Sequence, residues 1–165
     1  MAVKDTLLPD FDQEMAATRQ VLERVPDAAF GWRPHASSYD MGGLATHLAQ
    51  IPRWGCAILE HDDHDLAVAG TPPATLTTVG AVLEQFDRHV RQVRAALCES
   101  ADGQLMAPWT LKRGTHLVLS MPRIAALRTF VVHHSIHHRG QMTVYLRMHD
   151  VALPPLYRST ANEWL

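Results

Sequence analysis

Apolar side chains recur along this chain at steps of three and four residues, the period of a helix with one buried face. This spacing predicts four long helices, over about residues 9–25, 38–60, 77–97 and 122–148. Ser38 or Asp40 can cap the start of the second, and Thr77 or Thr78 that of the third. A longer connection through Ala69–Pro73 joins these two helices, so we expect an all-α four-helix bundle with one long crossover connection.

Prolines and irregular stretches interrupt this pattern. Pro52 lies within the second predicted helix, and because it lacks an N–H and crowds the preceding turn, it predicts a kink. Residues 99–120 lack helical spacing, and Leu117–Leu119 is a short strand or an extended loop. The proline-containing tail Leu153–Tyr157 cannot be helical and should lie across the bundle. No repeat or second hydrophobic pattern divides the chain, so we expect one domain over residues 1–165.

Composition and charge narrow the functional classes. The chain has 165 residues, 47% of them apolar and 19% charged, which is typical of a globular protein. Its formal net charge of −2 argues against a nucleic-acid-binding protein, which usually carries a basic surplus. No apolar run is long enough to span a membrane, and no signal peptide precedes the first helix. We therefore expect a cytoplasmic protein with neither a nucleic-acid nor a membrane partner.

Histidine is the residue type in excess. The chain has 11 histidines, and four of them fall between His133 and His138 on the last predicted helix. At 100° per residue, His138 lies roughly 10° from the mean direction of the apolar side chains and His134 roughly 50° from it. His137 and His133 lie at roughly 110° and 150°, on the flank and the outer face. We therefore predict that His134 and His138 point into the bundle.

A pair of histidines becomes a metal site only with a further ligand. Catalytic zinc sites use three protein ligands and keep one position open. His47 lies at the edge of the apolar stripe of the second predicted helix, and it is the third candidate ligand. Cys56, nine residues later, faces about half a turn away and is interpreted as a packing residue. Gln141 and Tyr145 lie on the same side of the last predicted helix as His134 and His138. We expect Gln141 to support a ligand and Tyr145 to line the pocket.

The candidate ligand set selects a class of metal and excludes several known sites. Three neutral imidazoles suit zinc, nickel, copper or ferrous iron, and they do not suit magnesium or calcium. Ser135 stands where an HExxH protease would carry its glutamate, which disfavours that class. The chain also lacks the G-x-S-x-G elbow, the Walker loop and the G-x-G-x-x-G motif. For Arg139, expected to point away from the bundle interior, a structural ion pair is favoured over a catalytic role.

The segment from His134 to Gln141, HSIHHRGQ, resembles the DinB/YfiT-like superfamily of small metal-binding four-helix bundles. The resemblance continues in Trp32-Arg33-Pro34, in Met41–Ala49 and in Leu153–Tyr157, so it spans nearly the whole chain. It implies a divalent metal held by one histidine of the second helix and two of the fourth. By position these are His47, His134 and His138. It also implies a homodimer.

Characterised members of this superfamily include S-transferases and isomerases that use low-molecular-weight thiols. The resemblance therefore favours a metal-dependent, thiol-dependent S-transferase that acts on a small-molecule substrate, with zinc or nickel as the first choice of metal. A bound metal lowers the pKa of a thiol or a water, so the same site also suits a hydrolase that uses bound hydroxide. A metal-binding or sensing bundle without catalysis is the third hypothesis. The sequence assigns no catalytic residue, and it gives no role to Trp54, His133 or His137.

Overall fold

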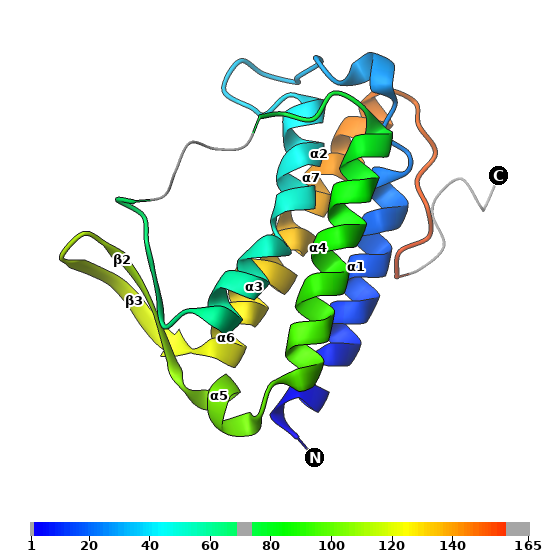
Figure 1. Cartoon of the computed structure of the whole chain (residues 1–165). Coiled ribbons are helices and arrows are strands. Elements are labelled where there is room, and N and C mark those ends of the chain that lie inside the picture. The colour runs from blue at the N-terminus through cyan, green and yellow to red at the C-terminus, as the bar shows by residue number, and fades with distance from the viewer. Residues whose placement is uncertain (1, 69–73, 158–165) are drawn as a thin grey trace.

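The computed structural model describes residues 2–68 and 74–157, and the long helices pack side by side in it (Figure 1). The long helical elements are α1 (Leu8–Leu22), α2 (Met41–Gln50), α3 (Arg53–Glu60), α4 (Val79–Glu99) and α7 (His134–Met148). Short 3₁₀ turns lie at Val3–Thr6 and Asp27–Ala29. The four predicted helical regions are confirmed, and the predicted connection at Ala69–Pro73 lies outside the described residues.

Two predicted caps fix where α2 and α4 begin. The Asp40 carboxylate accepts a hydrogen bond of 2.7 Å from the N–H of Gly43, and the Thr78 hydroxyl accepts one of 3.2 Å from the N–H of Ala81. Each cap satisfies an N–H group that has no partner within its own helix. Because Asp40 caps α2, which begins at Met41, His47 falls on the second turn of the helix, on the side that faces α7.

The predicted kink at Pro52 divides the second helical region into α2 and α3. Pro52 has no N–H to donate into the preceding turn, so the regular hydrogen-bond ladder stops there. The buried His89 of α4 fills the kink, and its Nδ1 donates a hydrogen bond of 2.8 Å to the Ala49 carbonyl. Burial lowers the pKa of His89, which favours the neutral ring. The kink is therefore held by a residue from another helix.

A small sheet corrects the expectation of an all-α chain. It consists of β1 (Asp63–Asp65), β2 (Pro108–Arg113) and β3 (His116–Pro122), in the order β1-β2-β3. β1 is parallel to β2, and β2 and β3 form an antiparallel hairpin that follows the short helix α5 (Asp102–Met106). The hairpin occupies the stretch without helical spacing, and Leu117–Leu119 adopts the strand alternative.

Buried side chains and ion pairs explain why this segment leaves the helical state. Trp109 and Leu111 alternate with more exposed neighbours on β2, the period of a strand with one buried face. Asp63 of β1 forms an ion pair of 2.8 Å with Lys112 of β2. Asp65 accepts a hydrogen bond from the N–H of Gly114, which has a φ of +59° in the hairpin turn. The acidic run after α3 thus fastens the sheet to the bundle.

The last helical region is not a single regular α-helix. It begins with α6 (Arg123–Leu127), continues as the π-helical segment η3 (Arg128–His133), and ends as α7. A π-type turn contains an additional residue, so residues before and after it do not share one 100° phase. The mean direction of the apolar side chains, calculated for one regular helix across this region, placed Arg139 away from the bundle interior. That placement is wrong, because Arg139 is only 2% exposed.

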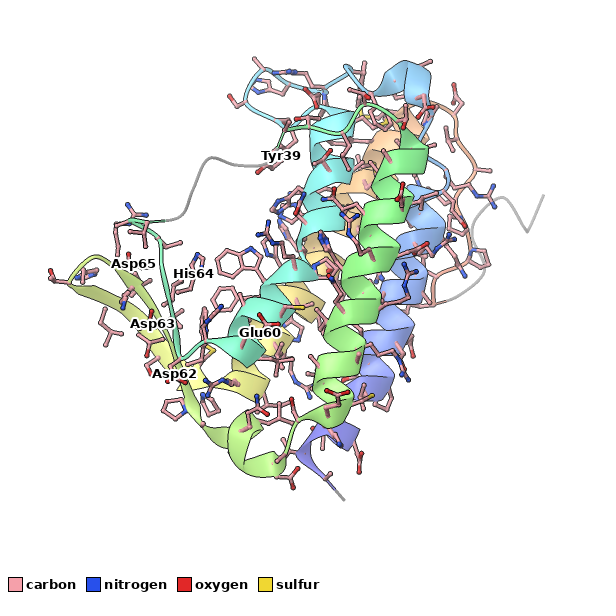
Figure 2. All side chains as sticks on the ribbon, in the orientation of Figure 1. Tyr39, Glu60, Asp62, Asp63, His64 and Asp65 are labelled. Atoms are coloured by element: carbon pink, nitrogen blue, oxygen red, sulfur yellow. The ribbon has the colours of Figure 1, made fainter. Side chains whose placement is uncertain are left out.

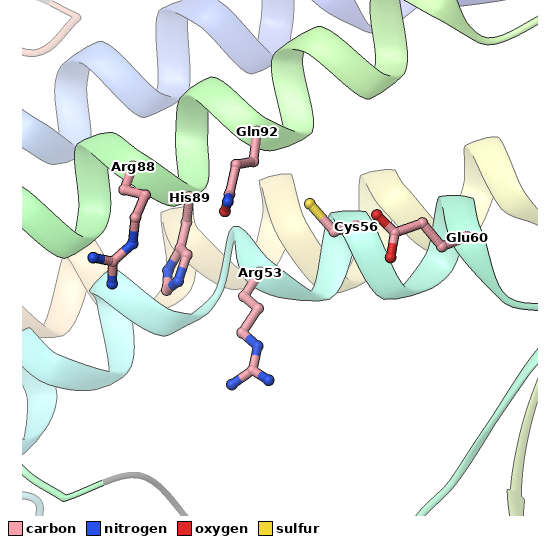
Figure 3. A pocket seen from close by; sticks show the side chains of 6 residues that line it. All are labelled: Arg53, Cys56, Glu60, Arg88, His89 and Gln92. Carbon is pink, nitrogen blue, oxygen red and sulfur yellow. The ribbon is translucent and has the colours of Figure 1, made fainter.

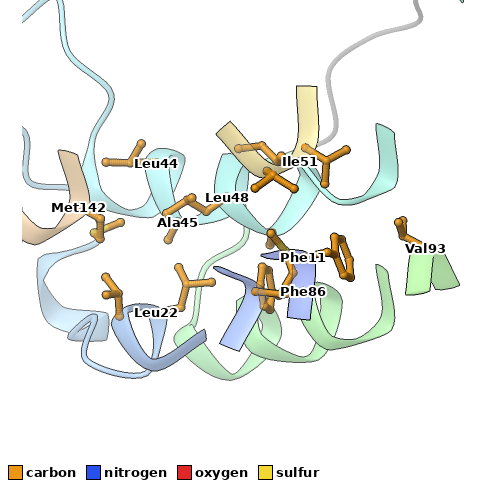
Figure 4. Packing of buried hydrophobic residues seen from close by; sticks show 14 of the residues in the cluster. Phe11, Leu22, Leu44, Ala45, Leu48, Ile51, Phe86, Val93 and Met142 are labelled. Atoms are coloured by element: carbon orange, nitrogen blue, oxygen red, sulfur yellow. The ribbon is translucent and has the colours of Figure 1, made fainter. Parts of the chain in front are cut away.

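The hydrophobic core lies between the long helices (Figure 4). It includes Phe11 and Leu22 of α1, Leu48 of α2, Phe86 of α4 and Met142 of α7, all buried. The apolar faces of α1 and α4 are thus covered within the bundle. Across residues 2–68 and 74–157, no helix combines the length and apolar character that crossing a membrane requires.

Candidate metal centre

Three histidines from two helices meet between α2 and α7. The Nε2 atom of His134 lies 3.3 Å from Nε2 of His47 and 2.9 Å from Nε2 of His138. The ligand atoms of all three lie within 4.8 Å of one another. In the described part of the chain, this is the one cluster of three or more His, Cys, Asp or Glu side chains with metal-binding spacing. The structure therefore brings together the three predicted ligands.

The spacing of these nitrogens suits a transition-metal ion. Zinc binds imidazole nitrogen at about 2.0–2.1 Å, and tetrahedral angles then place neighbouring nitrogens about 3.3 Å apart. The two Nε2 separations of 3.3 and 2.9 Å are close to that value. The three rings are partly buried, so one side of the cluster is open to solvent. A tetrahedral ion held here would keep its fourth position for a ligand.

A hydrogen-bond chain fixes the orientation of one of the three rings. The Gln141 Oε1 atom lies 2.8 Å from Nδ1 of His138, and its Nε2 atom lies 3.1 Å from Nε2 of His137. The amide nitrogen donates, so His137 accepts and the amide oxygen accepts the Nδ1–H of His138. His138 is therefore the tautomer whose Nε2 lone pair faces the cluster. This is the support that metal-binding histidines generally receive from a neighbour.

The surroundings keep the three imidazoles neutral near pH 7. Burial, and then the neighbouring His138 and His134, lower the pKa of His47 from 6.5 to about 4. Burial first and His138 second lower the pKa of His134, and the Phe130 carbonyl partly offsets this. Burial also lowers the pKa of His138, against the effect of its bond to Gln141. Neutral rings present the lone pairs that a metal requires.

The remaining candidates lie outside the cluster. His133 is exposed. His137 is also exposed; it hydrogen-bonds Gln141, and its ring packs edge-on against that of His138, with centroids 4.8 Å apart. Cys56, whose thiol pKa is raised by burial, lines a separate groove of about 540 Å³ between α3 and α4 (Figure 3). The other residues of that groove are Arg53, Glu60, Arg88, His89 and Gln92. The prediction that Cys56 faces away from the histidines agrees with this placement.

Arg139, next to His138 in the sequence, enters a second buried polar cluster. Its guanidinium donates hydrogen bonds of 3.0 Å to the Glu14 carbonyl and 3.3 Å to the Thr18 hydroxyl. It also forms an ion pair of 2.5 Å with the Glu14 carboxylate. The Tyr157 hydroxyl donates to the same carboxylate at 2.7 Å, so the tail lies against α1 and α7. The structural ion pair favoured for Arg139 is present.

Aromatic side chains border the three histidines. Tyr145 is buried, and its hydroxyl donates a hydrogen bond of 3.1 Å to the Tyr39 carbonyl. The Tyr39 ring stacks on the His47 ring, with centroids 5.6 Å apart. Sequence reasoning missed Tyr39, although its position directly before the Asp40 cap places it at the start of α2. Figure 2 shows Tyr39 and His64 on the same side of the bundle.

Comparisons with known proteins identify a family and similar proteins. The model of the DinB family matches residues 1–164. The uncharacterized protein YrdA of Bacillus subtilis (strain 168) is 24% identical over 160 residues, which are 97% of this chain and 91% of YrdA.

Two solved structures have a similar fold. The DinB-like protein YjoA of Bacillus subtilis has a TM-score of 0.71 at 15% identity, over 94% of this chain and 99% of YjoA. A DinB-like protein of Bacillus cereus ATCC 10987 has a TM-score of 0.70 at 20% identity, over 93% of this chain and 97% of that protein. At these identities the likeness shows the fold alone.

Proposed function

The chain belongs to the DinB family, and from that premise we propose that His47, His134 and His138 bind a divalent transition metal in a thiol-dependent S-transferase. The observation that carries this proposal is the convergence of three Nε2 atoms, two pairs of which lie 2.9 and 3.3 Å apart. Neutral imidazole nitrogens at such distances can share one N–H per contact, whereas a central cation would accept the lone pairs of all three rings at once. Imidazole ligands favour zinc, nickel, copper or ferrous iron.

The metal would supply Lewis acidity that lowers the pKa of a thiol or a water at its open position. The residues of the chain hold and shape that position. Gln141 keeps the Nε2 lone pair of His138 directed at the centre, and the Tyr39 ring covers one side of His47. In the transfer, the thiol releases its proton to solvent and its sulfur bonds to an electrophilic carbon of the second substrate. The leaving group departs with the electrons of the broken bond.

The first experiment is metal analysis of the protein purified without added metal, followed by X-ray absorption spectroscopy of the metal's ligand sphere. We expect about one transition-metal ion per chain and three imidazole ligands. The loaded protein is then assayed with low-molecular-weight thiols and an electrophilic aromatic such as 1-chloro-2,4-dinitrobenzene. Metal-dependent formation of the thioether supports the transferase. A loaded site that forms no thioether with any thiol, or a closed site with four protein ligands, contradicts it.

A further inference from the structure

Large aromatic side chains lie along the same seam between helices as the three histidines. Trp54 of α3 follows His47 by seven residues, about two helical turns, and Phe130 of η3 precedes His134 by four, about one turn. The three histidines lie in the interface between α2 and α7. The elements that continue this interface, α3 and η3, also pack on each other, and there the aromatic rings take the place of the histidines. Neither ring is part of the three-histidine cluster.

These rings form a defined surface, which we call the aromatic shelf: Trp54, Phe130 and His64. The Trp54 and Phe130 rings are nearly parallel, at 24° with centroids 6.1 Å apart. The His64 ring lies 4.7 Å from that of Trp54. All three side chains are partly exposed. The fully buried Trp109 supports the shelf from within, 5.7 Å from Phe130.

The other end of the seam carries Tyr39, which is 52% exposed. Its ring stacks on His47 at 15° and meets the edge of His138 at 6.3 Å. Its main chain is held by the hydrogen bond from the Tyr145 hydroxyl. A ligand held at the histidines therefore lies between Tyr39 on one side and the aromatic shelf on the other.

The acidic side chains near the aromatic shelf are already paired within the protein, so they do not select an ionic ligand. The three aspartates beside His64 each have a partner within the protein. Asp62 pairs with Arg123, Asp63 pairs with Lys112, and Asp65 accepts N–H groups of Ala67 and Gly114. These contacts also hold β1, and with it His64, in place. The features left to recognise a ligand are thus flat, partly exposed rings.

We propose that the second substrate at this centre carries an aromatic ring, which stacks on the aromatic shelf while its reactive group lies at the three histidines. This inference rests on the proposed metal function and names the class of electrophile. Trp54 and Phe130 are specificity-determining residues that contact the ring. Aromatic rings prefer such stacked or edge-on contacts over equal areas of aliphatic surface.

The test compares two hydroxamate probes on the zinc-loaded protein by isothermal titration calorimetry. Benzohydroxamate and acetohydroxamate share a metal-binding head, and only the first has a ring. We expect benzohydroxamate to bind roughly tenfold more tightly. Trp54→Leu should remove most of this preference and leave acetohydroxamate binding unchanged. Trp32→Leu, at a tryptophan that packs on Tyr145 and His149 instead, should keep it. Equal affinities in the wild type, or a preference that survives Trp54→Leu, overturn the proposal.

A measurement without metal separates this inference from the proposed function. Benzamide is titrated into the metal-free wild-type protein, and the indole N–H signals of the tryptophans are followed by nuclear magnetic resonance. We expect a saturable shift of the Trp54 signal and none of the Trp32 signal. If zinc does not bind but Trp54 shifts, the metal function fails and the aromatic subsite stands. If the Trp54 signal does not move, the aromatic subsite is overturned, whether or not zinc binds.

Discussion

His138 and Arg139 are neighbours on α7, yet they belong to two polar clusters of opposite character. The cluster of Arg139 is closed: its charge meets Glu14, and Thr18 and Tyr157 complete the hydrogen bonds. The cluster of His138 consists of three neutral rings whose Nε2 atoms face one another without an acidic partner.

The difference indicates how a structural polar cluster is told from a binding one. A buried charge is tolerated when a partner of opposite sign and additional hydrogen bonds satisfy it. The Arg139 cluster meets this condition with residues of α1, α7 and the tail, so it fastens these segments together. The histidine cluster lacks such an internal partner, and a cation from outside would complete it.

The largest expected effect is on stability, in the closed cluster. Glu14→Ala leaves the Arg139 charge buried without its partner, so we expect a loss of about 3–5 kcal/mol in the free energy of unfolding, measured by urea denaturation. Asp12→Ala, on the same helix, breaks an exposed ion pair with Arg94 and should cost less than about 1 kcal/mol. Similar losses for the two variants would show that Arg139 is not held by Glu14 in the manner described.

The next largest effect is on metal affinity, in the cluster of three histidines, which we call the open cluster. Alanine in place of His47, His134 or His138 removes one of three protein ligands, so we expect zinc affinity to fall by more than about a hundredfold in a chelator competition assay. Zinc should raise the melting temperature of the wild type and not that of these variants. His133→Ala is the matched control and should bind zinc like the wild type. Loss of zinc in His137→Ala with retention in His134→Ala would mean that the other pair forms the site.

The open cluster should also make the metal-free protein sensitive to acid. The pKa of His47 is lowered from 6.5 to about 4, so between these values the unfolded chain binds a proton that the folded chain does not. Stability is therefore full above about pH 6.5 and falls as the pH decreases toward 4. Urea midpoints at pH 7.5, 6 and 5 measure this. His47→Gln should flatten the curve, although His89, His134 and His138, whose pKa values are also lowered, leave part of the slope. An identical slope in both proteins would exclude His47 as a source.

The smallest effect concerns the residue that orients His138. Gln141→Ala removes the acceptor for the Nδ1–H of His138, so we expect zinc affinity to fall about tenfold, measured in the same competition assay. His137→Ala should have a smaller effect, because His137 bonds the amide nitrogen of Gln141 and packs edge-on against the His138 ring but does not accept its Nδ1–H. An unchanged affinity in Gln141→Ala would show that His138 needs no partner to keep its orientation.

Much of the fold and the site could be predicted because the signals are local. Helical spacing located the four regions, and Asp40, Thr78 and Pro52 marked two starts and one kink. The four-residue step from His134 to His138 puts both rings on one side of α7 wherever that helix packs. His47 was identified by its position at the edge of the apolar stripe of its helix, and the family resemblance implied the same residue.

The remainder could not be predicted because it depends on contacts between distant segments. The sheet forms because Asp63 and Asp65 meet the hairpin, about fifty residues further along the chain. The π-helical segment has no spacing signal of its own, and it shifted the phase at which Arg139 was expected.

The sequence by itself determined the helices, their caps and the histidine pair, since these follow from neighbours within one or two turns. Only the tertiary structure decided that His47 meets His134, that Glu14 meets Arg139 and that Trp54 stacks on Phe130. Each of these pairs joins two helices, and its geometry follows from how the whole core packs. A side chain's neighbours within its own helix are set by the helical repeat, whereas its partner across the bundle is set by the packing of every other residue in the interface.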